Sequence, residues 1–365
     1  MTDRRTSGIP LSALRPVLDA EGPLATVYLE AREAGADAED QVRLRWKSLN
    51  SQLAEAGADG ADGAALAALE EAILVDNITG VQAEGRVLVA NREGVLLNER
   101  WDATGDAGDR ASLGADADLG DYVRELARAV RALAVVASKE GATIQREVLA
   151  PSRVLETTER KEVAGSATES VHKPRGNWLE HKRIQRTADE ATTRNIRDVV
   201  AELADVAEDW RPDVVIVAGE VQGRSRLREE LPHALQEIAE EVETGGGIPQ
   251  GGADAGVEQA FAEAVTDVAE RLVEQRDLDL TNRFEEARAA GRTAEGVHQI
   301  RDAVQLGAVD TLLLRPDRRA PEENELLRAA AQVDASVALL DADLNGDIAA
   351  ILRFQVAAGA AVEHP

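Results

Sequence analysis

The stretch GVHQIRDAVQLGAVDTLLLRPD, residues 296–317, decides the fold of its part of the chain. Apolar residues recur at helical spacing up to Leu306, a Gly-Ala pair ends this pattern, and the mostly apolar run VDTLLL follows over 309–314. The stretch therefore predicts a helix that leads directly into a buried strand. Further on, LNGDIAAILRFQV, residues 344–356, predicts a turn followed by a second apolar strand.

Helices and strands alternate on both sides of this stretch. A helical pattern runs over residues 257–272, a second helix is predicted over 323–333, and SVALL, residues 336–340, predicts a further strand. This alternation favours a layered α/β/α domain. The run GGGIPQGGADAG, residues 245–256, has the composition of a flexible linker, so we place this C-terminal domain at residues 257–365.

Residues 121–244 predict a middle domain of mixed α/β type. Its long helix ends near residue 209 and follows a basic loop. The apolar stripe of this helix consists of Ile196, Val199, Val200, Leu203, Val206, Ala207 and Trp210. The segment DVVIVAGE, residues 213–220, follows as a short and nearly continuous apolar strand of the buried kind.

Residues 1–120 predict an N-terminal α/β domain. LATVYLEA, residues 24–31, predicts a strand, and GRVLVANREGVLLNERW, residues 85–101, predicts a hairpin whose turn is NREG. Between them lies a helix whose apolar positions follow the spacing i, i+4, i+7 and i+11: Val42, Trp46, Leu49 and Leu53. The predicted fold class is therefore α/β (α+β), with three mixed domains.

One short segment has a charge opposite to that of the whole chain. The formal net charge is −27, yet VHKPRGNWLEHKRIQR, residues 171–186, holds five Lys or Arg residues and one Glu, which gives +4. A strongly acidic protein repels polyanions unless positive charge is concentrated locally. The segment precedes the long helix and has Trp178 near its centre, so it is a candidate surface for a polyanion.

The candidate RNA-binding residues of this segment are His172, Lys173, Arg175, Gly176, Asn177, Trp178, His181, Lys182, Arg183 and Arg186. The cations would neutralise phosphates, and the indole of Trp178 would stack on an unpaired base, which contributes about 1–3 kcal/mol. The alternative is a solvated, positively biased loop whose tryptophan packs against its own domain. The residues alone leave both interpretations open.

Composition limits the remaining functions. The chain of 365 residues has no cysteine, which excludes disulfides and thiolate chemistry. His172 and His181 lack the spacing of metal ligands, and position 352 of the stretch DADLNGDIAAIL holds Leu where a calcium loop needs Glu, so we predict no metal and no cofactor. No apolar run has the length of a membrane span or the form of a signal peptide, so we expect a cytoplasmic protein without a membrane partner.

The two stretches 296–317 and 344–356 resemble the C-terminal domain of the archaeo-eukaryotic class I release factor and Pelota superfamily. In that superfamily a helix also runs into a Gly-Ala-Val-(Asp/Glu)-x-Leu-(Leu/Ile) strand, and the domain closes on an Ile-Leu-Arg-(Phe/Tyr) strand. The order of elements in the first and middle segments is similar to that of the other two domains. The resemblance implies a three-domain translation factor.

Two motifs of the release factors in that superfamily are missing here. Gly-Gly-Gln acts at the peptidyl-transferase centre, but the corresponding residues here are Arg175-Gly176-Asn177-Trp178. The codon-reading Asn-Ile-Lys-Ser is replaced by GADGADGA, residues 57–64. The chain therefore resembles the bacterial branch of the superfamily, the Balon-like ribosome hibernation factors. This implies a protein that occupies the ribosomal A site and contacts rRNA, with elongation factor Tu as a further candidate partner.

Two other functions are compatible with the residues. One is a hydrolase of peptidyl-tRNA or nucleic acid with noncanonical residues, and the other is a protein-interaction module without an RNA partner. The sequence contains no Gly-x-Ser-x-Gly motif and no phosphate loop, and its paired carboxylates are too abundant among 68 acids to identify any. We therefore expect a hibernation or rescue factor that is not an enzyme.

Overall fold

The fold is mixed α/β, as predicted, in a computed structural model whose described residues form three sheets. Described are residues 8–32, 35–58, 63–76, 78, 81–82, 85–101, 108–150, 153–164, 166, 178–243 and 255–356. Only the backbone is described at residues 58, 76, 150, 153–160, 178–189, 255, 257 and 258. The chain divides into two compact units, Met1–Arg128 with Arg276–Pro365, and Ala129–Gln275.

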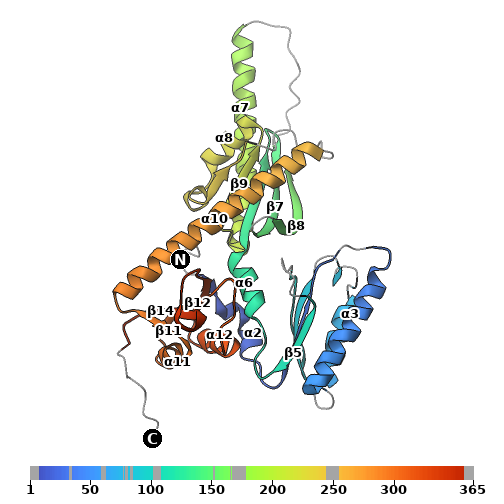
Figure 1. Ribbon diagram of the computed structural model, residues 1–365. Coiled ribbons are helices and arrows are strands. Elements are labelled where there is room, and N and C mark those ends of the chain that lie inside the picture. The colour runs from blue at the N-terminus through green and yellow to red at the C-terminus, as the bar shows by residue number, and fades with distance from the viewer. Residues whose placement is uncertain are drawn as a thin grey trace. The chain divides into compact units, whose positions relative to one another are not determined.

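The N-terminal sheet of the first unit is antiparallel throughout, in the order β4-β3-β2-β5. Its strands are β2 (Leu24–Leu29), β3 (Arg86–Asn91), β4 (Gly94–Glu99) and β5 (Arg110–Gly114). The predicted strand and hairpin are thus confirmed. Helices α3 (Ala38–Leu53) and α4 (Gly63–Glu71) cover one face of the sheet, α3 with all four predicted apolar residues buried (Figure 1).

The opposite face of this sheet is also apolar, and residues from both ends of the chain cover it. Leu24 and Val89 of this face belong to the same buried cluster as Leu312 and Val337, from near the C-terminus. Helix α6 (Gly120–Arg128) adds Val123 to the cluster. The N-terminal sheet therefore completes its core only with residues far away in sequence.

The C-terminal sheet has the order β1-β13-β12-β14-β11, in which only β12 and β13 are parallel. Its elements are β11 (Thr293–Glu295), α11 (Val297–Gln305), β12 (Val309–Leu314), α12 (Glu323–Gln332), β13 (Ser336–Leu339) and β14 (Ile348–Leu352). The predicted helix and strand of residues 296–317 are confirmed. Successive residues of β12 enter different cores, Leu312 and Leu314 on one face and Leu313 on the other, so both faces are covered.

The start of the chain belongs to the C-terminal sheet. Strand β1 (Ile9–Pro10) pairs with β13, and the 3-10 helix η1 (Leu11–Leu14) and helix α2 (Arg15–Leu18) follow it into the shared core. The guanidinium of Arg15 donates to the carbonyl of Ala331 at 2.8 and 3.0 Å, near the C-terminus of α12. This differs from the predicted N-terminal domain at residues 1–120, because a two-residue strand carries no signal of its pairing.

The second unit is built on a five-stranded sheet in the order β10-β9-β6-β7-β8. Its strands are β6 (Val130–Ala137), β7 (Gly141–Ala150), β8 (Arg153–Ala164), β9 (Val214–Gly219) and β10 (Ala239–Glu241). Its helices are α7 (Trp178–Trp210), α8 (Val221–Glu230) and α9 (His233–Gln236). Helix α6 ends at Arg128, because the next residues alternate into the sheet core, Val130 and Ala132 on one face and Leu133 on the other.

Helix α10 (Ala255–Ala289) contributes to both units. Its first half packs Phe261, Val265 and Val268 on the sheet of the second unit, which it crosses in Figure 1, and its second half packs Phe284 on the C-terminal sheet. The predicted boundary at residue 257 therefore differs from the observed division after Gln275. Of the predicted linker 245–256, residues 245–254 lie outside the described residues.

One carboxyl group is buried on the α10 side of this sheet. Glu147 of β7 pairs with Ala132 of β6 and so shares its face, where Ala132 and Leu149 pack in one cluster with α10. The side chain of Glu147 is buried, and its Oε2 atom has no hydrogen-bond partner among the described residues. Burial raises the pKa of this carboxyl from 4.5 to about 7.

Glu147→Gln should change how stability depends on pH. In the folded protein Glu147 stays protonated up to about pH 7, whereas the unfolded chain releases this proton near pH 4.5, so stability falls as the pH rises between these values. The accumulated cost above pH 7 is about 3 kcal/mol by the usual conversion of pKa into free energy. In urea denaturation, the free energy of unfolding of the Gln variant should rise by up to about 3 kcal/mol relative to that of the wild type as the pH increases from about 5 to about 8. A difference that stays constant with pH would contradict this.

Candidate functional site

The predicted RNA-binding segment lies at the start of α7. Five of its candidate residues lie outside the described residues: His172, Lys173, Arg175, Gly176 and Asn177. The other five lie in α7, where only their backbone is described: Trp178, His181, Lys182, Arg183 and Arg186. The segment was predicted as a loop over 171–186, but the backbone is helical from Trp178 because residues 178–210 contain neither Gly nor Pro.

The later part of α7 is fixed to the sheet by its apolar stripe. Ile196, Val199 and Leu203 are fully buried, and Val206 and Ala207 are buried as well, all in the core beneath β6 and β9. The predicted stripe is thus confirmed for these residues. The position of the helix is therefore set by packing from residue 196 onward.

Polar contacts on both sides hold the same part of α7. The side-chain amide of Asn195 donates to the carbonyl of Lys139 at 3.2 Å, in the β6–β7 turn. Arg197 forms an ion pair with Glu230 of α8 at 2.9 Å. The Asp198 carboxylate accepts hydrogen bonds from Ser166, which lower the pKa of Asp198. The helix therefore has a fixed end from which its earlier turns extend.

The first turns of α7 extend past the end of the sheet in Figure 1. From Trp178 to Glu190 the helix rises by about 18 Å, at 1.5 Å per residue. These turns include the last nine residues of the +4 segment, 178–186, whereas the chain as a whole is acidic. The anchored helix can therefore hold its basic end away from the acidic body of its own unit, which reduces repulsion of a polyanion.

The other end of α7 holds a cation and aromatic cluster that the sequence did not reveal. The guanidinium carbons of Arg131 and Arg146 lie 5.0 and 5.6 Å from the ring centroid of Trp210, within the range of cation–π attraction. Arg131 also donates to the carbonyl of Trp210 at 3.3 Å. The pairing of β6 with β7 brings the two arginines together. Their contacts with Trp210 hold the C-terminal end of α7 against these two strands.

The described residues also bear on the metal and membrane predictions. In the part of the chain that the structure describes, no group of three or more His, Cys, Asp or Glu residues could hold a metal ion. The stretch considered for calcium forms a tight turn at Asn345–Asp347, as predicted, and Asp341 pairs with Arg315 at 3.4 Å. No described helix is long and apolar enough to cross a membrane.

Residues 131–290 match the sequence model of bacterial archaeo-eukaryotic release factor family 2. This range covers the second unit except its first two residues, and it includes all of α7 and α10. The match confirms, for this part of the chain, the predicted resemblance to the bacterial branch of the archaeo-eukaryotic release factors.

A similar curated protein is the uncharacterized protein Rv2629 of Mycobacterium tuberculosis strain ATCC 25618 / H37Rv. It is 28% identical over 315 residues, which cover 82% of this chain and 77% of that protein. The same values hold for the uncharacterized protein MT2704 of strain CDC 1551 / Oshkosh. Similarity to these proteins thus extends well beyond the region that the family model matches.

Solved structures of the superfamily align along nearly the whole chain at low similarity. The archaeal translation termination factor aRF1 has 20% identity and a TM-score of 0.26, covering 94% of this chain and 96% of its own. Archaeoglobus fulgidus Pelota has 15% identity and a TM-score of 0.31, covering 95% and 94%. A model of ribosome-bound archaeal Pelota and ABCE1 has 15% identity and a TM-score of 0.41, covering 96% of each chain. Similarity at this level carries no conclusion about activity.

Leu203→Ala should destabilise the second unit by about 2–5 kcal/mol, because it removes a fully buried side chain from the core that anchors α7. Urea denaturation would measure the change. The matched control is Arg197→Gln on the same helix, which removes an ion pair whose arginine is mostly exposed and should change stability by about 1 kcal/mol or less. Equal effects of the two variants would show that packing does not fix the helix.

Proposed function

We propose that this protein is a ribosome-binding translation factor that occupies the A site and acts in ribosome hibernation. The family match supports a role in translation, because the family is defined by its relation to release factors. The observation that carries the proposal is a +4 segment, residues 171–186, in a chain of net charge −27. Its residues 178–186 form the first turns of α7, a helix that is anchored by its later part. Ribosomal RNA is the polyanion that such a segment would meet in the A site.

We further propose that the protein does not catalyse peptide release. Release of a peptide needs a positioned water and help with proton transfer. The Gly-Gly-Gln that serves release factors is replaced by Arg175-Gly176-Asn177-Trp178, which offers cationic and aromatic contacts in place of glutamine. The segment would therefore bind near the peptidyl-transferase centre and leave the ester bond of peptidyl-tRNA intact.

The basic segment should give ribosome binding a strong dependence on salt. Five phosphate contacts at a slope of about −0.7 each give about −3.5 in log K against log salt, or about 100-fold weaker binding from about 50 to about 200 mM. The variant with Lys173, Arg175, Lys182, Arg183 and Arg186 changed to Gln should bind more weakly with a flatter slope in cosedimentation.

Trp178→Ala provides the matched control for this series, because loss of stacking releases few ions. It should weaken ribosome binding while keeping the salt slope. A fivefold Gln variant that stays folded and keeps both the affinity and the slope of the wild type would show that the segment is only a solvated surface. Cosedimentation with and without elongation factor Tu tests that candidate partner in the same assay.

Ribosomes that carry peptidyl-tRNA should keep their peptide after this protein is added, whatever codon stands in the A site. The protein should compete with A-site tRNA for the same ribosomes. A release assay with labelled peptidyl-tRNA measures the first outcome, with a true release factor as the positive control. Release at a rate comparable to that control would favour the hydrolase alternative.

A further inference from the structure

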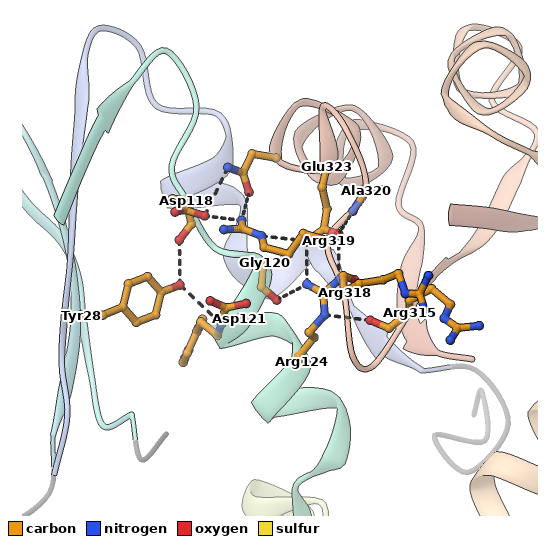
Figure 2. A network of polar contacts seen from close by, with 12 residues as sticks. Tyr28, Asp118, Gly120, Asp121, Arg124, Arg315, Arg318, Arg319, Ala320 and Glu323 are labelled. Atoms are coloured by element: carbon orange, nitrogen blue, oxygen red, sulfur yellow. Dashed lines mark hydrogen bonds and ion pairs between the residues drawn. The ribbon is translucent and has the colours of Figure 1, made fainter. Parts of the chain in front are cut away.

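Arg124 of α6 lies at the centre of a buried polar network (Figure 2). Its Nη1 and Nη2 atoms donate to the two carboxylate oxygens of Glu323 on α12, at 2.6 and 2.8 Å. Its other N–H groups donate to the backbone carbonyls of Gly120, Arg315 and Arg318, at 3.0, 2.8 and 2.6 Å. All five N–H groups of the guanidinium thus have an acceptor.

The carboxylate of Glu323 has little freedom in this position. Its side chain is only 2% exposed, and its Oε2 atom also accepts the backbone N–H of Ala320 at 3.1 Å. A Cβ atom at Gly120 would lie 2.3 Å from Oε1 of Glu323, so the close approach of α6 to this carboxylate requires glycine. Loss of either charge would leave the other buried without its partner, which is costly.

Asp118 makes a second connection beside the first. Its carboxylate accepts a hydrogen bond from Arg319, in the loop before α12. Its backbone carbonyl accepts a hydrogen bond from the hydroxyl of Tyr28 on β2 (Figure 2). Its backbone N–H donates to Oγ1 of Thr26, also on β2, at 3.0 Å. One residue therefore contacts the N-terminal sheet through its backbone and the C-terminal residues through its side chain.

We propose that the N-terminal and C-terminal parts of the first unit are a single cooperative folding unit, with the Arg124–Glu323 pair as the contact that couples the two sheets. The network and the shared apolar core connect the same elements, namely β2, α6 and α12. Neither sheet then unfolds while the other stays folded. Residues 129–275 are an insertion in the sequence of this folding unit.

Hydrogen exchange of the full-length protein tests this coupling. Glu323→Gln breaks the buried ion pair on α12, and the most protected amides of β12 should exchange about 100-fold faster than in the wild type. The amides of β3, in the other sheet, should accelerate by the same factor, whereas those of β9 in the second unit should not. Faster exchange in β12 with unchanged exchange in β3 would overturn the proposal.

Glu325→Gln is the matched control, because this residue of α12 pairs with Arg301 in a partly exposed position, at 3.1 Å. It should change exchange in either sheet by less than about fivefold. The wild-type protein supplies a second test that does not depend on a variant folding. As urea is added, the slowest amides of β3 and β12 should converge on one opening reaction with one urea dependence. Separate reactions for the two sheets would also overturn the proposal.

Discussion

The N-terminal sheet has two apolar faces, and its own helices can cover only one of them. Helices α3 and α4 complete one core, but Leu24, Val87 and Val89 face the other way. Exposing such side chains to water costs about 1.5–3 kcal/mol each. The second face is covered by the C-terminal elements of the chain and by its first helical turns.

The end of α12 shows how closely the two ends of the chain are connected. Arg15, near the start, donates to the carbonyl of Ala331, and Arg353, near the end, donates to the carbonyls of Val333 and Asp334 at 2.9 and 3.0 Å. Helix carbonyls at a C-terminus lack partners within the helix and carry partial negative charge, so arginines are suited to this place. The arginine of the resembled Ile-Leu-Arg-Phe motif therefore has a structural role here.

The elements with strong local patterns could be predicted from the sequence. The hairpin of β3 and β4, the buried strand β9 and the apolar stripe of α7 all follow from periodicity within a few turns or one strand. The pairing of β1 with β13 and the contact of Arg124 with Glu323 join residues far apart in sequence, and no local pattern encodes them. The charge pattern of residues 171–186 does not indicate that α7 begins at Trp178, because the same cations can stand on a loop or on a helix.

The candidate site could be predicted only as a composition, and the structure adds the helix on which part of it lies. A cationic segment at the end of a firmly packed helix can contact RNA in spite of the negative net charge of the chain. Because the chain has no cysteine, a single cysteine at Gln185 can carry a tethered iron that cleaves nearby RNA. In ribosome complexes, a probe at this position should cleave large-subunit rRNA around the peptidyl-transferase centre. Cleavage of this rRNA by a probe at the exposed Ser48 of α3, with no cleavage by the probe at position 185, would contradict the proposed contact of the basic segment.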